Sequence, residues 1–198
     1  MQTSPNRTNG RGIFAFLCGT ALIGVLLGTL SFCLNAGQAD TLLFFKDSGL
    51  SARAGMEHGR LMAGSLLGST VFLLGIALAG FCAFGQPFEL ALIVLRGMGL
   101  GYTLAEVYSA VGKSGVPYAA GLLLPGAVIS TLALVAAARE ALRLSNIYLR
   151  LTLSDRQENG TAAAVRLYGT KLLVIEAMLA LSAGADTLCN FLFIGKLA

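Results

Sequence analysis

Four ionisable side chains lie inside long apolar stretches of this sequence. Arg96 and Glu106 fall in one stretch, and Glu176 and Asp186 fall in another. A charged side chain near the centre of a bilayer costs about 2.5–3.5 kcal/mol on insertion scales, so it normally faces protein or water. These residues therefore indicate one of two roles, which are pairing between helices and a route for protons or ions.

The depth of each charged residue in its predicted span helps to decide between pairing and an ion route. At ~1.5 Å per helical residue, Arg96 lies ~12 Å and Glu176 ~8 Å from the cytoplasmic ends of their stretches. By the same count Glu106 (~27 Å) and Asp186 (~22 Å) lie near the opposite side. We predict an ion pair between Arg96 and Glu176. An ion route through Glu106 and Asp186 is the alternative, and it is less favoured because such routes usually place acids near the midplane.

Catalytic and metal-binding patterns are poorly represented. The single histidine, His58, sits in a charged segment beside Glu57, without neighbours at metal-ligand spacing. The sequence contains no HExxH, no GxSxG and no GxxxxGK[ST] motif, and its four cysteines form no CxxC pair. We therefore expect no enzyme activity, no cofactor and no metal site.

The composition indicates which kind of structure carries these charged residues. Of 198 residues, 56% are hydrophobic and 12% are charged, and the mean hydropathy is +0.76. A soluble domain carries roughly twice that charged fraction. The net charge of +4 comes from basic residues that lie mainly between apolar stretches, which fits membrane topology better than nucleic-acid binding. The sequence predicts an all-α integral membrane protein, in one polytopic domain covering residues 1–198.

Five stretches are long enough to cross a bilayer, which takes about 20 apolar residues per helix. We predict spans at about residues 13–34, 61–84, 88–110, 116–138 and 171–195. They leave an outer loop at 36–60 and a cytoplasmic loop at 139–170.

Orientation follows from the basic residues outside the spans. With the N-terminus in the cytoplasm, eight Lys and Arg residues lie inside and five lie outside. Positive residues concentrate on the cytoplasmic side of membrane proteins. We expect a multi-pass protein of the cell membrane with a cytoplasmic N-terminus.

Small residues recur four positions apart in several spans, which allows helices in lipid to approach closely. We predict packing roles for Gly24, Gly28, Gly64, Gly68, Gly97 and Gly101. Packing of these glycines against other helices of the same chain is the default interpretation. Contact between two copies of the chain, as homo-oligomerisation, is the more specific alternative.

The segment 138–153 has a basic helical face. Arg139, Arg143 and Arg150 share this face with Asn146, while apolar side chains share another. We interpret it as an interfacial or cytoplasmic helix that extends the fourth span and faces anionic lipid head groups. A specific lipid or partner site is the alternative.

The region from Leu73 to about Leu151 resembles the stage II sporulation protein M family. The resemblance depends on the order of short motifs: a Gly-x-Pro turn, a basic residue followed by Gly, a Gly-Tyr pair, a glycine-rich outer turn and a Leu-Pro pair. These are Gly85 and Pro87, Arg96 and Gly97, Gly101 and Tyr102, Gly112 and Gly115, and Leu124 and Pro125. Many relatives have Asn or His close to this last proline, whereas Gly126 follows it here.

The resemblance implies a non-enzymatic membrane scaffold of endospore formation. Family members sit in the sporulation septum and help the mother cell to engulf the forespore. They recruit peptidoglycan-degrading enzymes, an amidase and a lytic transglycosylase, to the outer face. The outer segments 36–60 and 111–116 would then be docking surfaces, and Pro87 and Pro125 would set helix bends and breaks. The rival hypothesis is a permease or a membrane subunit of a transporter, which would use the intramembrane acids.

Overall fold

The computed structural model describes residues 7–34, 58–111, 124–153 and 161–194, and all of them are helical except the turn 81–85. The helices are α1 (Arg7–Leu34), α4 (His58–Gly80), α5 (Gln86–Val111), α7 (Leu124–Leu153) and α8 (Thr161–Ile194). The predicted outer loop 36–60 lies mostly outside these residues, as do parts of the cytoplasmic loop 139–170. The all-α fold class is confirmed for the part of the chain that the structure describes.

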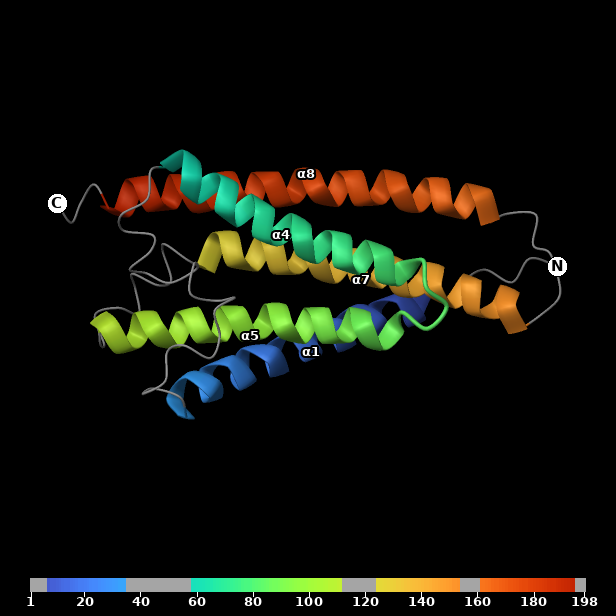
Figure 1. Cartoon of the computed structure of the whole chain (residues 1–198), viewed down its shortest axis with the longest axis horizontal. Coiled ribbons are helices and arrows are strands. Elements are labelled where there is room, and N and C mark those ends of the chain that lie inside the picture. The colour runs from blue at the N-terminus through green and yellow to red at the C-terminus, as the bar shows by residue number, and fades with distance from the viewer. Residues whose placement is uncertain (1–6, 35–57, 112–123, 154–160, 195–198) are drawn as a thin grey trace.

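The helices form one elongated bundle (Figure 1). α1, α5 and α8 run in one direction, and α4 and α7 run in the other. α1 packs mainly on α5, and α8 packs on α4 and α7, so that α4 and α7 lie between the α1–α5 pair and α8. Each helix of the bundle therefore has an antiparallel neighbour, which for α1 is α7.

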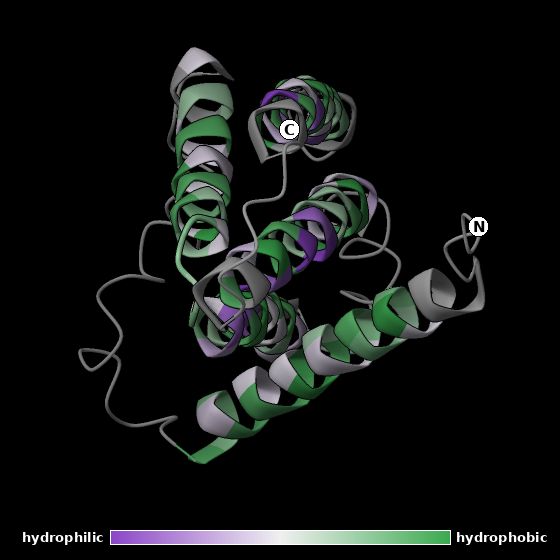
Figure 2. Ribbon diagram, turned by 90° about the vertical axis from the view of Figure 1, so that its right-hand side faces the viewer, coloured by the Kyte–Doolittle hydropathy of each residue, from purple (hydrophilic) through white to green (hydrophobic). Residues whose placement is uncertain are grey.

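Four of the helices are long and apolar enough to cross a membrane. The crossing segments are Gly12–Leu34, Met62–Gly80, Gln86–Ser109 and Val165–Cys189. Their outward faces carry large apolar side chains such as Leu26, Leu78 and Leu181. Figure 2, which looks along the bundle, shows the predominance of hydrophobic residues in these helices. The described part of the chain is therefore all-α, with four helices suited to a membrane.

α7 has a more extensively buried face than the other four helices, while Leu132 and Arg139 on its other side are exposed. Ala137, Ala138 and Ala141 are completely buried, and Leu134 and Val135 nearly so. α7 contacts each of the other four helices, and it continues without interruption through the basic segment 138–153. That segment is thus part of α7 and not a separate helix. Of the predicted fourth span, residues 116–123 lie outside the described part.

The turn between α4 and α5 begins earlier and is longer than the sequence predicted, since it takes up residues 81–85. α4 ends at Gly80 and not near residue 84, and the chain reverses through backbone hydrogen bonds from Cys82 N–H to Ala79 O and from Gly85 N–H to Cys82 O. A Cβ atom at Gly85 would overlap the carbonyl group of Ala79. Glycine is therefore required here for a close backbone approach.

Pro87 and Pro125 begin helices. Pro87 lies in the first turn of α5, and Pro125 lies in the first turn of α7. A first-turn residue has no intrahelical acceptor for its N–H group, so proline is tolerated there. Of the expected bends and breaks, Pro87 lies next to the break between α4 and α5. For Pro125, the residues that precede Leu124 lie outside the described part of the chain.

Candidate functional site

The closest helix contact in the bundle is the crossing of α1 and α5. A Cβ atom at Gly24 or Gly28 would overlap backbone atoms of Val94 or Met98, and a Cβ at Gly97 or Gly101 would overlap the backbone of α1. The two helices therefore touch backbone to backbone, as small residues permit in membranes. The structure places these four glycines together at one interface within the chain.

Gly64 and Gly68 lie elsewhere. Both are exposed on α4, and a Cβ added to either would have no neighbouring heavy atom within 4 Å. The packing role predicted for this pair within the chain is thus corrected. The spacing of four puts the two glycines on one helix face, but it does not tell whether that face points inward.

The interior of the bundle holds polar side chains in three layers, the first of them near the C-terminal end of α8. Ser65 Oγ of α4 donates a hydrogen bond to Asp186 Oδ2 (3.4 Å), and Ser182 Oγ donates to the carbonyl oxygen of Gly126 (2.6 Å). A Cβ at Gly126 would lie 2.9 Å from Asp186 Oδ1. Gly126, which follows Pro125, is the position against which Asp186 packs.

The second layer contains Arg96 and Glu176, whose side chains have different hydrogen-bond partners. Arg96 Nη2 donates to Ser130 Oγ of α7 (2.9 Å), and its guanidinium group lies 5.7 Å from the centre of the Phe72 ring. Glu176 Oε1 accepts a hydrogen bond from Thr70 Oγ1 of α4 (2.7 Å), and its Oε2 is buried without a hydrogen-bond partner among the described residues.

The predicted ion pair between Arg96 and Glu176 is not among the contacts of the described residues. α5 and α8, which carry the two side chains, are separated by α4 and α7 (Figure 1). The similar depths of the two residues do not make them partners, because depth along a helix does not determine which helix is the lateral neighbour.

The third layer lies at the end of the bundle that holds the α4–α5 turn. Lys171 Nζ and Glu140 Oε2 form an ion pair of 2.6 Å between α8 and α7. Ser145 Oγ donates to the carbonyl oxygen of Cys82 (2.9 Å), and Tyr168 Oη donates to that of Ala77 (3.4 Å). Each of these contacts joins two helices or a helix to the turn.

Glu89 also belongs to this third layer, and the sequence analysis missed it. Its side chain is completely buried, and neither carboxyl oxygen has a hydrogen-bond partner within the described ranges. Tyr168 lies within electrostatic range of both Glu89 and Glu140. Glu89 is only the second residue of the predicted span 88–110, so its position in the sequence alone indicates a polar flank.

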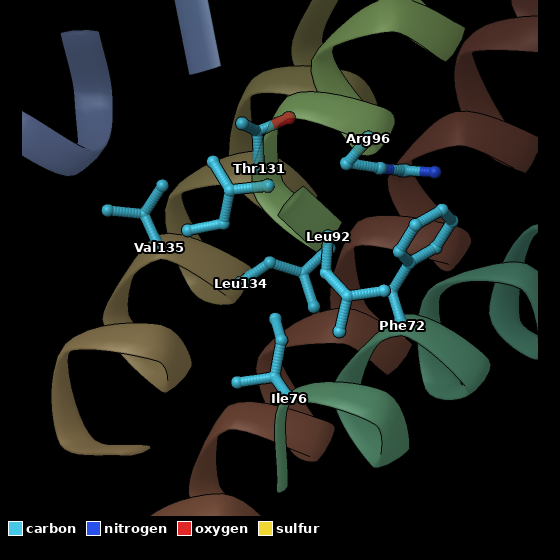
Figure 3. Close-up of a pocket in the computed structure, with 8 residues that line it drawn as sticks. Phe72, Ile76, Leu92, Arg96, Thr131, Leu134 and Val135 are labelled. Carbon is cyan, nitrogen blue, oxygen red and sulfur yellow. The ribbon is translucent and has the colours of Figure 1, made fainter. Parts of the chain in front are cut away.

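An apolar layer separates Arg96 from Glu89. It is formed by side chains of α4, α5 and α7, among them Ile76, Leu92 and Leu134, and the space that they line has no room for a water molecule. Figure 3 shows Arg96 beside Phe72, with Ile76 and Leu134 further from the guanidinium group. Arg96 and Thr131 line the same space, so these apolar side chains lie directly beside the second polar layer.

The remaining predicted residues lie outside these layers. Arg139 and Arg143 are exposed on α7, and the side chain of Arg150 lies outside the described part. Glu106 is half-buried on α5, whose main neighbours are α1, α4 and α7 and not α8. The structure therefore does not bring Glu106 together with Asp186.

Within the described ranges, no group of three or more His, Cys, Asp or Glu side chains could hold a metal ion. Comparison with models of protein families, with curated proteins and with solved structures finds no match for this chain. The class of protein is therefore defined by the fold alone, as a helical bundle suited to a membrane.

The polar residues that sequence reasoning missed are the neutral partners of the charges. Thr70, Ser130 and Ser65 each hydrogen-bond to an ionisable side chain of another helix. Hydroxyl residues are common in membrane helices and often bond to their own backbone, as Thr131 does. The sequence signal that could have identified these partners is a Ser or Thr that lies at the same depth in its helix as a charged residue of another helix.

Proposed function

We propose that this chain is a non-enzymatic membrane scaffold, a rigid bundle that presents its outer segments to partners. The observation that carries the proposal is the way each polar layer joins neighbouring helices, together with the backbone contact of α1 and α5. Hydrogen bonds between membrane helices are worth about 0.6 kcal/mol on average and up to about 1.7 kcal/mol. Several such bonds, with close packing, favour one fixed arrangement.

The proposal includes five membrane crossings. α7 runs antiparallel to α5 along the same bundle, and one face of its middle is buried against the four apolar helices. A helix that buries one face against protein tolerates a more polar sequence than one that faces lipid all round. Five crossings put the N-terminus and the segment that connects α7 to α8 on one side, which the basic residues favour as cytoplasmic.

The more specific form of the proposal is a role in endospore formation. The motifs shared with the stage II sporulation protein M family support it, and they lie largely in α5 and at the start of α7. In this role the chain sits in the septum and recruits an amidase and a lytic transglycosylase through segments 36–60 and 111–116.

Deletion of the gene in its host tests this role. Starved cells stained with a membrane dye are expected to stop at a flat or bulging septum around an unengulfed forespore. Wild-type chain should restore engulfment, whereas a chain with residues 36–60 replaced by a neutral linker should reach the septum and fail to restore it. Normal engulfment in the deletion strain, or a host that forms no spores, contradicts the role.

The permease hypothesis makes a different prediction in the same strain. Glu106→Gln and Asp186→Asn should abolish uptake of a substrate if these acids line a route. Under the scaffold proposal both variants support engulfment as long as they accumulate in the membrane. The water-excluding apolar layer across α4, α5 and α7 favours the scaffold.

A further inference from the structure

Glu89 is a buried ionisable side chain that has no part in the proposed scaffold role. Its carboxyl group is fully buried, and both oxygens lack a hydrogen-bond partner in the part of the chain that the structure describes. An isolated ionised carboxylate in such surroundings is far more costly than a neutral carboxyl group, and a buried group of this kind takes up a proton instead. The first turn of α5 offers only the partial positive charge of a helix N-terminus, which is a modest compensation.

The charged neighbours of Glu89 in the described helices do not supply a counter-ion. Lys171 of α8 is already paired with Glu140 of α7 at 2.6 Å, and Tyr168 of α8 directs its hydroxyl to Ala77 O. The α4–α5 turn contributes the carbonyl oxygen of Gly85, which accepts from the backbone N–H of Glu89, and its thiol, Cys82, is exposed. On α5 itself, Arg96 lies two turns away, beyond the apolar layer.

Access to Glu89 is unequal from the two ends of the bundle. On the side of Arg96, Ile76, Leu92 and Leu134 line a space that has no room for a water molecule. Toward the other end lie Tyr168 and the partly exposed pair of Lys171 and Glu140, with side-chain exposures of 35% and 18%. Among the described residues, this second side is the one that connects the carboxyl group to polar, solvent-reaching side chains.

We infer that Glu89 is a proton-binding site with access from the α4–α5 end of the bundle only. The carboxylate takes a proton from water at that membrane surface and forms an O–H bond, and the neutral acid is the form that the packed bundle holds. Release of the proton leaves a buried carboxylate, which favours separation of the α4–α5 turn from α7 and α8. The site is thus a one-sided pH-sensitive latch and not part of a route across the membrane.

Infrared difference spectroscopy of the purified, full-length protein in lipid tests the proton. Wild-type protein at near-neutral pH should show the carbonyl stretch of a protonated carboxyl group, which shifts in D₂O and disappears in alkaline buffer. Glu89→Gln should remove this band and preserve the fold, because the amide has the same shape. Glu106→Gln is the matched control and should leave the band unchanged. A wild-type spectrum without the band, or a band that survives Glu89→Gln, overturns the inference.

Cysteine labelling tests the direction of access separately. Glu89→Cys, in a chain whose native cysteines are replaced, should react with a small membrane-impermeant thiol reagent from the face of the α4–α5 turn only. Labelling from the opposite face, or equal labelling from both, contradicts one-sided access. Neither experiment depends on sporulation, so failure of the latch and failure of the scaffold role are distinguishable.

Discussion

At Gly28 and Gly101 the missing side chains set the distance between two helices. A methyl group at either position would overlap backbone carbonyl groups, at Met98 and Val25 respectively. Backbone atoms cannot rotate away as a flexible side chain can, so the helices would have to separate.

We therefore expect Gly28→Ala to destabilise the bundle by about 1–3 kcal/mol, as overpacking does. Gly64→Ala should change its stability little, since that position faces open space and alanine has the higher helix propensity. Thermal unfolding of the two variants in the same detergent measures the difference. Equal losses would contradict the backbone contact, and a loss of oligomers confined to Gly64→Ala would reveal an interface between copies at that face.

The separate partners of Arg96 and Glu176 lead to a charge-reversal prediction. Arg96→Glu leaves an acid beside Ser130, and Glu176→Arg leaves a base beside Thr70. The double variant should accumulate in the membrane no better than the worse single variant. Recovery of accumulation in the double variant would establish a direct pair that this structure does not contain.

At the scale of elements, the start of α5 shows how local sequence positions a helix. Gly85 allows the close turn, and Pro87 begins the helix without loss of a hydrogen bond. The turn also fixes the location of Glu89, whose backbone N–H donates to Gly85 O (3.0 Å).

Pro87→Ala should accordingly cost less than about 1 kcal/mol, because a first-turn proline only pre-sets the backbone. Leu100→Pro, in the interior of the same helix, should cost ~3 kcal/mol or more. Denaturant titration followed by circular dichroism compares the two variants. A large loss with Pro87→Ala would show that the proline shapes α5 beyond its first turn.

The elements differ in how far the sequence predicted them. The lengths of the apolar stretches predicted most of the ends of α1, α4 and α5 to within a few residues, because membrane thickness sets the length of a spanning helix. For α7 the sequence predicted that the basic segment extends the fourth span, and the helix is continuous through it. The burial of one α7 face against four neighbours is a tertiary property, which the sequence did not indicate. The third polar layer was unpredictable for the same reason: Glu140 meets Lys171 only when α7 and α8 lie side by side.

At the scale of the whole molecule, the five-span proposal predicts the sidedness of each connection. Single cysteines introduced by Ser48→Cys and Ala162→Cys, in a chain without native cysteines, should be labelled from opposite faces by an impermeant maleimide. The cysteine at position 48 should react from outside intact cells, and the one at position 162 should react only after permeabilisation. Labelling of both from outside would mean that α7 does not cross the membrane.

The pairing of α1 with α5 has a consequence for biosynthesis. These helices run parallel and meet through glycines that lie far apart in the chain, such as Gly24 and Gly97. α1 therefore enters the bilayer without its main partner, and its glycine strip faces lipid until α5 has been inserted. α7 similarly depends on α8, which is made after it, for the Glu140–Lys171 ion pair. Nascent chains released before α8 is complete would leave both Thr70 and Glu140 without their partners.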